Sequence, residues 1–410
     1  MNCHSIRVDF PEIIERGLVY LDSAASSLKP IQVVEAMRSF SKLRYANVHR
    51  GAYRVSLEAS KAYEDAHEIV GKHINAWSWE EVIFTRNTTE AIQLAALTLL
   101  TNGFISEGSE IIVSESEHHS NLLPWVRIAR LAKAKIKLIP VNSEGIPRWD
   151  ILEDLISEKT RVVSVGHVSN VTGYKSDVRR IAEIAHKYGS LVVVDGAQSV
   201  PHMKVNVREL NIDFLAFSGH KMLGPTGIGV LWGRLEYLNK LEPPLGGGGT
   251  VRRVKLESNN VNIEWNNPPW RFEAGTPPII EAIGLSEAVS YLSRIGMENV
   301  ESHERILTEY TLSRLGELEG VRILGPRDSS RRLGIVSFNV RSIDPSMVGA
   351  WLDSYNIAVR SGLHCAHILH DKLGESNGSV RASFYIYNCR EDIDKLIDAL
   401  KELIVKVSRS

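Results

Sequence analysis

The sequence predicts an α/β protein: a large domain built on a mainly parallel central sheet, followed by a smaller α+β C-terminal domain. Three observations support this fold class. From Tyr20 to about Leu231, short apolar runs alternate with helical patterns, which is typical of a parallel sheet covered by helices. The stretch from Glu242 to Pro278 interrupts the alternation. After Ile279 the pattern changes to a long helical stretch and then to strands of alternating polarity.

The expected elements of the large domain follow from its apolar runs. These runs predict strands at 81–84, 110–113, 135–139, 161–165, 191–194 and 213–217. A helical pattern from Thr89 to Leu100 follows the first strand, and another follows the second. Ligands of such sheets bind beyond the carboxyl ends of the strands, so residues at those ends are candidates for a functional site.

The interrupting segment, 242–278, is rich in proline and glycine. A connector of this length in a compact protein is more often a functional loop or a subunit contact than a plain linker. The basic residues Arg252, Arg253 and Lys255 within it are expected to lie in a solvated loop.

The elements of the small domain are also readable. A long helix is expected over 280–318, a half-buried strand over 336–340, and further strands at 357–359 and 380–385. Asp344 is expected to cap a helix over 345–354, with Pro345 in its first turn. Asn388 is expected to cap the last helix, with Glu391 three residues on. The domain boundaries are placed at 1–20, an N-terminal segment that packs with the small domain, 21–278 and 279–410.

Composition bounds the class of protein. The chain has 410 residues, of which 43% are hydrophobic and 24% charged, as in an ordinary globular protein. A formal net charge of −1 gives no electrostatic footprint for nucleic acid. No run reaches the roughly 18 apolar residues of a membrane helix, and the N-terminus lacks an apolar signal region. We therefore expect a cytoplasmic protein without membrane or nucleic-acid partners.

The cysteines are few: Cys3, Cys365 and Cys389. An odd and sparse count is no disulfide framework, and it suits a reducing compartment. Cys389 is expected to be structural.

A lysine and an aspartate at strand ends are the most informative pair. Lys221 closes the run that begins at Ser218, directly after one apolar strand, and Asp195 ends another. The amine can form a Schiff base with an aldehyde cofactor, and the carboxylate can keep a pyridinium nitrogen protonated. Asp195 could equally cap a helix.

Hydroxyls and a histidine suggest a phosphate site near this pair. Thr88 and Thr89 lie between a predicted strand and a predicted helix, where free N–H groups and the helix dipole favour an anion. Ser218 and His220 could donate to the same phosphate. The alternatives are plain N-capping by Thr88 and an ordinary loop histidine.

Other polar residues could complete a cofactor site. His118, in a turn after the 110–113 strand, could stack on a cofactor ring, or it could lie in a surface turn. Gln198 could contact the cofactor or be an ordinary turn residue. Arg381 could bind a carboxylate with its planar fork, or form a surface salt bridge.

Cys365 is a candidate nucleophile. Arg360 and the flanking histidines would favour its thiolate, although an inert buried cysteine is the default for this residue type. His364, His367 and His370 also permit a metal site. We expect no metal, because ligation would quench the nucleophile.

On these motifs, the chain resembles the SufS-type cysteine desulfurases, which are class V aminotransferase-like, pyridoxal-phosphate enzymes of fold type I. The resemblance runs nearly end to end, and the run from His364 to Ala366 is specific for desulfurases. The other matching segments are 20–25, 48–51, 88–90, 117–121, 167–171, 195–198, 218–221, 224–229, 271–277 and 381–383.

The resemblance implies a role for each site residue. Lys221 would hold pyridoxal 5′-phosphate, Asp195 would pair with its ring nitrogen, and His118 would stack on the ring and take part in catalysis. The other cofactor contacts would come from Gln198 at the phenolic oxygen, from Thr88, Thr89, Ser218 and His220 at the phosphate, and from Asn170.

The resemblance also implies substrate contacts and a dimer. Asn170 and Arg381 would bind the substrate carboxylate, Arg360 would lie close to the nucleophile, and His49 and Arg50 would belong to the substrate site. Thr276 would reach the phosphate bound by a partner subunit, so a homodimer is expected.

The implied reaction converts L-cysteine to L-alanine and leaves a persulfide on Cys365, which an acceptor protein takes for iron–sulfur cluster assembly. Alternatives are a selenocysteine lyase, or a class V aminotransferase, lyase or epimerase in which Cys365 is incidental. A non-catalytic assembly partner is disfavoured, because it would need neither Lys221 nor Asp195. The chain departs from related enzymes at Leu363, usually histidine, at His367-Ile368, where proline is usual, and near Val251, where methionine is usual.

Overall fold

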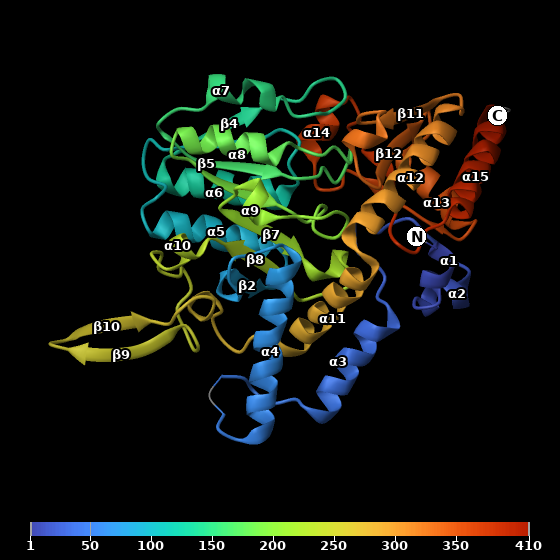
Figure 1. Ribbon diagram of the computed structural model, residues 1–410. Coiled ribbons are helices and arrows are strands. Elements are labelled where there is room, and N and C mark those ends of the chain that lie inside the picture. Colours follow the sequence, from blue (N-terminus) through green and yellow to red (C-terminus); the bar gives the residue numbers. More distant parts are fainter. Residues whose placement is uncertain (1, 50, 409–410) are drawn as a thin grey trace.

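The computed structural model describes residues 2–49 and 51–408, and its largest element is a central sheet (Figure 1). Within the described residues this sheet has seven strands in the order β2-β8-β7-β6-β5-β3-β4. Their bounds are β2 Val82–Thr85, β3 Glu110–Ser114, β4 Lys135–Ile139, β5 Thr160–Gly166, β6 Leu191–Asp195, β7 Phe214–Ser218 and β8 Gly229–Gly233. The five strands from β7 to β4 are parallel, whereas β8 is antiparallel to both its neighbours. The predicted mainly parallel sheet is confirmed.

The inner strands are apolar because both faces of the sheet are covered. Val192 and Val194 of β6 belong to one core, whereas Leu191 and Val193 belong to another. The first core also takes side chains from α4 (Arg54–His73), α8 (Val178–Lys187) and α11 (Ile279–Ile295). The second takes them from α5 (Thr88–Thr101) and α6 (His119–Ala132). Because successive side chains of a strand point to opposite faces of the sheet, each strand contributes to both cores.

Shorter elements complete the large domain. They are α3 (Ile31–Leu43), α7 (Leu152–Leu155), α9 (Val207–Leu210), α10 (Leu235–Leu238) and the 3-10 helices η1 (Trp79–Glu81), η2 (Trp149–Ile151), η3 (Gly219–Lys221) and η4 (Trp270–Phe272).

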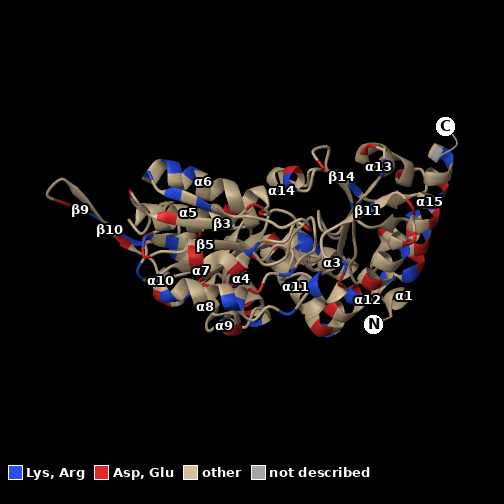
Figure 2. Cartoon of the chain, turned by 90° about the horizontal axis from the view of Figure 1, so that it is seen from above, with Lys and Arg blue, Asp and Glu red and all other residues tan. Residues whose placement is uncertain are grey.

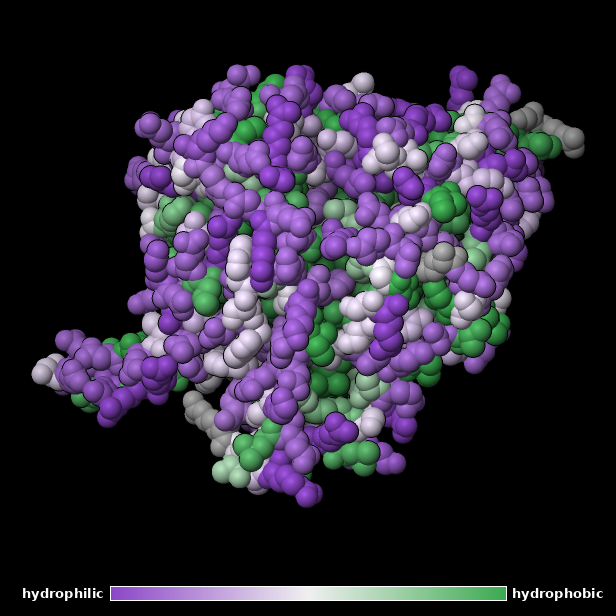
Figure 3. All heavy atoms as spheres, viewed as in Figure 1, coloured by the Kyte–Doolittle hydropathy of each residue, from purple (hydrophilic) through white to green (hydrophobic). Residues whose placement is uncertain are grey.

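The segment 242–278 contains a β-hairpin that projects from the body of the molecule (Figure 1). Its strands are β9 (Val251–Glu257) and β10 (Asn260–Trp265), which pair antiparallel. Arg252, Arg253 and Lys255 are exposed, but they lie on β9, so the expectation of a loop was wrong. Hydrophilic side chains cover most of the hairpin in Figure 3.

A second, antiparallel sheet follows in the C-terminal part, in the order β11-β12-β15-β14. Its strands are β11 (Val321–Leu324), β12 (Ile335–Val340), β14 (Arg360–Gly362) and β15 (Ser379–Ser383). Around it lie α12 (Met297–Gly316), η5 (Ser329–Arg331), α13 (Pro345–Asp353), α14 (His367–Lys372) and α15 (Arg390–Ser408). The predicted cap of α13 is confirmed, since the Asp344 side chain accepts a hydrogen bond from Ser346 N. Figure 2 shows basic and acidic residues interspersed along the outer helices, including α15.

Three sequence expectations for this part need correction. The helix expected over 280–318 is two helices, α11 and α12, divided at Gly296, whose φ of 86° is left-handed. The strand at 336–340 is more than half-buried, since even Ser337 has no exposed surface. The last helix begins at Arg390, one residue later than expected, and the Asp392 carboxylate accepts from Cys389 N at 3.0 Å.

The N-terminal segment contacts the C-terminal part of the chain, and its Phe10 and Ile13 also belong to the first core of the central sheet. It contains α1 (Cys3–Arg7), α2 (Pro11–Arg16) and β1 (Val19–Tyr20), and β1 pairs parallel with β13 (Ile357–Ala358). The Arg7 guanidinium bonds both the Tyr387 carbonyl and the Asp392 carboxylate. The domain boundaries at residues 20 and 278 stay predictions.

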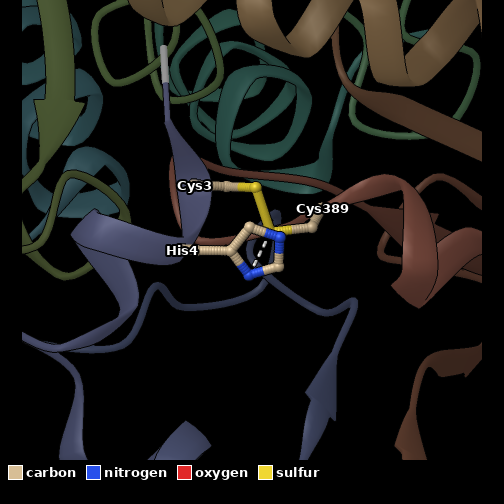
Figure 4. A group of neighbouring side chains, drawn as sticks. All are labelled: Cys3, His4 and Cys389. Carbon is tan, nitrogen blue, oxygen red and sulfur yellow. Dashed lines mark hydrogen bonds between the residues drawn. A yellow bond between two sulfur atoms is a disulfide. The ribbon is translucent and has the colours of Figure 1, made fainter.

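A disulfide joins Cys3 to Cys389, with 5.8 Å between their Cα atoms (Figure 4). The odd and sparse cysteine count, interpreted as no disulfide framework, did not predict this bond. Folding brings together cysteines 386 positions apart, which no local spacing could indicate.

Among the helices that the structure describes, none combines the length and the apolar character that a membrane span requires.

Candidate active site

A cavity of about 480 Å³ opens at the carboxyl ends of β5, β6 and β7. Residues that the sequence had singled out at widely separated positions meet in its wall. Those that line it are Thr88, Thr89, His118, Asn170, Asp195, Gln198, Ser218, His220, Lys221, Arg360, Cys365 and Arg381. The parallel sheet explains the large-domain members, because the turns after neighbouring strands share one edge.

Lys221 ends η3, the short turn that follows the fully buried strand β7. Burial lowers the pKa of its amine to about 8, and the charge of Asp195 opposes part of that shift. A substantial fraction of the amine is therefore neutral near physiological pH, and only the neutral amine is nucleophilic.

Asp195 ends the neighbouring strand β6 and is itself buried. Its Oδ1 accepts a hydrogen bond from Ala197 N at 3.0 Å. Burial raises the pKa of its carboxyl group, whereas this hydrogen bond and the Lys221 charge lower it. An unpaired buried carboxylate is costly, so the position favours a cationic partner in the cavity.

His118 caps α6 and is half-buried at the cavity, not in a surface turn. Its Nδ1 accepts a hydrogen bond from Ser120 N at 3.0 Å, which places the proton on Nε2. Burial lowers the pKa of His118 to about 3, and the nearby Lys221 charge acts in the same direction. The imidazole is thus neutral and of one tautomer, as a flat stacking surface requires.

Hydroxyl groups gather at the N-terminus of α5. Thr88 donates its backbone N–H to Ser218 Oγ at 2.8 Å, and the two hydroxyl oxygens are 2.6 Å apart. Thr89 Oγ1 lies 2.6 Å from Ser120 Oγ. The cap of this helix is Asn87, which accepts from Glu90 N, so plain capping does not explain Thr88. The cluster is suited to an anion, because each hydroxyl pair leaves one O–H donor over at the positive end of a helix.

Besides His364 Nδ1, two buried polar atoms in the cavity wall have no hydrogen-bond partner among the described residues: Gln198 Oε1 and Arg381 Nε. Their neighbours are held in place, since Gln198 Nε2 donates to Ala24 O at 2.8 Å. Arg381 Nη1 donates to Asn170 O at 3.0 Å. Buried polar atoms are normally paired, so these two point to a polar ligand.

Cys365 lies in a constrained loop between β14 and α14. Its φ of 55° and the φ of 48° at His364 are both left-handed, a conformation that costs on the order of 1–3 kcal/mol per non-glycine residue. His119 N donates to the Cys365 carbonyl at 2.8 Å and ties the loop to α6. Cys365 is exposed, and it is the free cysteine among the described residues.

The histidines around Cys365 have other partners. His364 Nε2 lies 3.0 Å from Ser379 O. Both ring nitrogens of His370 are within hydrogen-bond distance of partners, Ala366 O at 3.0 Å and Ser379 Oγ at 3.1 Å. The His367 ring stands edge-on to His119, with centroids 4.5 Å apart. This arrangement does not favour the alternative metal site.

Sequence reasoning missed two acidic residues of the cavity region. Glu117 is buried below His118, and burial raises its pKa to about 7 although Asn121 and Ser114 donate hydrogen bonds to it. Asp22 forms a bidentate ion pair with Arg360. Both residues belong to segments that resemble the desulfurases, but only the tertiary structure shows which residues they contact.

Two residues predicted for the site, His49 and Thr276, do not line this cavity within one chain. They line a separate cavity of about 740 Å³, together with Gly248 and Trp270. The third, Arg50, lies outside the described residues.

Comparison with known proteins identifies the family. The aminotransferase class-V family model matches residues 19–396. A protein of Aeropyrum pernix named probable cysteine desulfurase is 58% identical over 406 residues, or 98% of each chain. The cysteine desulfurase of Haloferax volcanii is 44% identical and covers 97% of this chain and 95% of its own.

Solved structures agree with the sequence matches. The apo structure of a cysteine desulfurase from Thermococcus onnurineus has a TM-score of 0.93 at 43% identity, covering 98% of both chains. The S-sulfonic acid form of an Escherichia coli cysteine desulfurase has a TM-score of 0.89 at 38% identity, again covering 98% of both chains. This chain therefore belongs to the class-V aminotransferase family and, within it, to the cysteine desulfurases.

Proposed function

We propose that the protein is a pyridoxal-phosphate-dependent cysteine desulfurase that converts L-cysteine to L-alanine and leaves a persulfide on Cys365. The observation that carries the proposal is that Lys221, Asp195 and Cys365 line one cavity. Relatives named cysteine desulfurase, up to 58% identical over nearly the whole chain, support the same activity.

The residues of the cavity suit this cofactor. Lys221 would bind the aldehyde carbon, Asp195 the ring nitrogen, and Gln198 would contact the phenolic oxygen. The neutral His118 would cover the ring. The hydroxyls at the start of α5, with Ser218 and His220, would hold the phosphate. When bound, the cofactor supplies an electron sink for the carbon from which a proton is removed.

The chain's own residues divide the remaining work. Arg381, buried and with an unpaired Nε, would bind the substrate α-carboxylate, and Asn170 would hold that arginine through its carbonyl. The Lys221 amine, with a pKa near 8, suits a base that removes the Cα proton.

Cys365 would attack as a thiolate. Its sulfur forms a bond to the substrate sulfur while the substrate Cβ–S bond breaks. The Cβ atom keeps the electron pair of that bond and takes up one proton, which completes the methyl group, and the Lys221 ammonium would return a proton to Cα to give L-alanine. Cys365 is left as a persulfide, and its exposure suits transfer to another protein.

The proposed reaction also implies partners beyond the single chain. We infer an acceptor protein that takes the sulfur for iron–sulfur cluster assembly in the cytoplasm. We also infer a homodimer in which the cavity lined by His49 and Thr276 lies against the partner's cofactor site, since Thr276 does not reach the cavity of its own chain.

The test is mass spectrometry together with alanine release. Wild-type protein exposed to L-cysteine should gain one sulfur atom on Cys365, and Cys365→Ser should gain none and release alanine at a small fraction of the wild-type rate. A Cys365→Ser variant that released alanine and sulfide at the wild-type rate would contradict the proposal. Parallel assays with selenocysteine distinguish a selenocysteine lyase.

A further inference from the structure

Two arginines of the cavity face each other across neighbouring strands. Arg360 on β14 and Arg381 on β15 are direct partners in the antiparallel ladder. Side chains of directly opposed residues lie on the same face of a sheet, and like charges there repel. Both residues also line the candidate active site. A nearby group must therefore determine which of the two guanidinium groups is available to a ligand.

Asp22 is that group. Its carboxylate accepts from Arg360 Nε at 3.1 Å, at both oxygens, and from Arg360 Nη2 at 2.7 Å. Arg381 Nη2 lies farther away, 3.6 Å from Asp22 Oδ1. The aspartate belongs to the N-terminal segment and is held by its backbone, which bridges Ser383 of β15.

The guanidinium groups of Arg360 and Arg381 therefore differ in their hydrogen-bond partners. Asp22 occupies the fork of Arg360, whose side chain is about half exposed. Arg381 is buried, its Nη1 donates to Asn170 O, and its Nε has no partner among the described residues. An arginine fork binds a carboxylate with two parallel hydrogen bonds, so Arg381 is the one prepared for a ligand.

We propose that Asp22 is a positioning residue for substrate recognition: by holding the Arg360 fork, it assigns the substrate α-carboxylate to Arg381. It also supplies a negative charge that two cations share, and loss of one partner from a buried ion pair is costly. The inference rests on the proposed function, in which the ligand of Arg381 is an amino-acid carboxylate.

The variant Asp22→Asn tests the proposal because it keeps the shape and removes the charge. Arg360, released, would compete with Arg381 for the ligand carboxylate. In the cofactor-loaded enzyme we expect the affinity for L-alanine to fall at least tenfold and the KM for L-cysteine to rise similarly, with kcat within about threefold. Binding of cysteamine, which has an amine and a thiol but no carboxylate, should stay unchanged. Equal loss for both ligands would indicate general damage and would overturn the proposal.

A second substitution tests whether the released Arg360 side chain is what weakens L-alanine binding. If released Arg360 is the competitor, the double variant Asp22→Asn with Arg360→Gln should bind L-alanine at least fivefold more tightly than Asp22→Asn alone. Equal or weaker binding by the double variant would contradict this role. A crystal structure of Asp22→Asn should show the Arg360 side chain moved; an unmoved side chain would count against the proposal in the same way.

The control separates this inference from the proposed function. If Arg381→Gln binds L-alanine as tightly as wild type, the carboxylate assignment itself fails. If Arg381→Gln loses binding and Asp22→Asn does not, the role of Asp22 alone fails. Should Asp22→Asn not fold, Asp22→Glu displaces the charge by one methylene. It should weaken L-alanine binding at least threefold with cysteamine unaffected, and wild-type affinity would overturn the proposal.

Discussion

Cys3 and Cys389 form a disulfide that fastens the first helix to the start of the last one (Figure 4). The two chain segments that the disulfide joins also contain residues near the active site. On the N-terminal side, Ala24 lines the cavity and Asp22 bonds Arg360, which lines it too. On the C-terminal side, Tyr387, two residues before Cys389, has its hydroxyl 2.7 Å from Ser23 Oγ.

Loss of this disulfide should lower stability. In the chain-entropy description a cross-link acts on the unfolded chain, and removal of a native disulfide costs about 2–5 kcal/mol. We expect Cys3→Ser to unfold at lower guanidinium concentration than wild type under oxidising conditions. Dithiothreitol should destabilise wild type and the matched control Cys365→Ser, but not Cys3→Ser. Identical unfolding of Cys3→Ser and oxidised wild type would show that the disulfide contributes nothing.

Covalent uptake of pyridoxal phosphate by cofactor-free protein should depend on pH. The lowered pKa of Lys221, about 8, means that the nucleophilic neutral amine becomes more abundant as the pH rises from 7 to 9. The initial rate of attachment, trapped with borohydride and measured by mass, should rise across that interval. Lys221→Arg keeps the positive charge and should trap no cofactor. A rate that is flat from pH 7 to 9 would rule out this control by the amine.

Acid should destabilise the cofactor-free protein through its buried histidines. Burial lowers the pKa of His167 to about 4, so below its ordinary value of 6.5 the unfolded chain binds the proton more readily than the folded one. Stability is therefore fully present above pH 6.5 and is lost as the pH falls toward 4. Between pH 8 and pH 5, His167 should account for about 1–2 kcal/mol, at 1.36 kcal/mol per pKa unit.

Urea unfolding at the two pH values measures this effect. His167→Gln should show a smaller difference in the free energy of unfolding between pH 8 and pH 5 than wild type. The same difference in both proteins would mean that His167 is not a source of the acid sensitivity.

Thr276 should affect cofactor binding through a dimer. We expect sedimentation to give twice the chain mass, and Thr276→Val to weaken pyridoxal-phosphate affinity about tenfold, equivalent to roughly 1.4 kcal/mol for a lost hydrogen bond to a charged group. Thr276→Ser, which keeps the hydroxyl, should bind nearly as wild type does. A monomeric protein with full cofactor affinity would contradict the prediction.

Much of the site could be predicted because local sequence controls strand ends. The apolar runs before Asp195 and Lys221 require buried parallel strands, and the turns after such strands must meet at one edge of the sheet. The helix break at Gly296 and the hairpin strand at Arg252 were missed, because a glycine within an apolar pattern and a charged strand both give weak local signals.

The sequence by itself determined the α/β fold, the family and the residues from which the site is built, since periodicity and motif spacing are properties of neighbouring positions. The tertiary structure alone decided the pairings between distant positions. Cys3 meets Cys389, Asp22 occupies the Arg360 fork and leaves Arg381 Nε unpaired, and the His118 ring takes one neutral tautomer. These outcomes depend on burial and on distances between segments that only folding brings together.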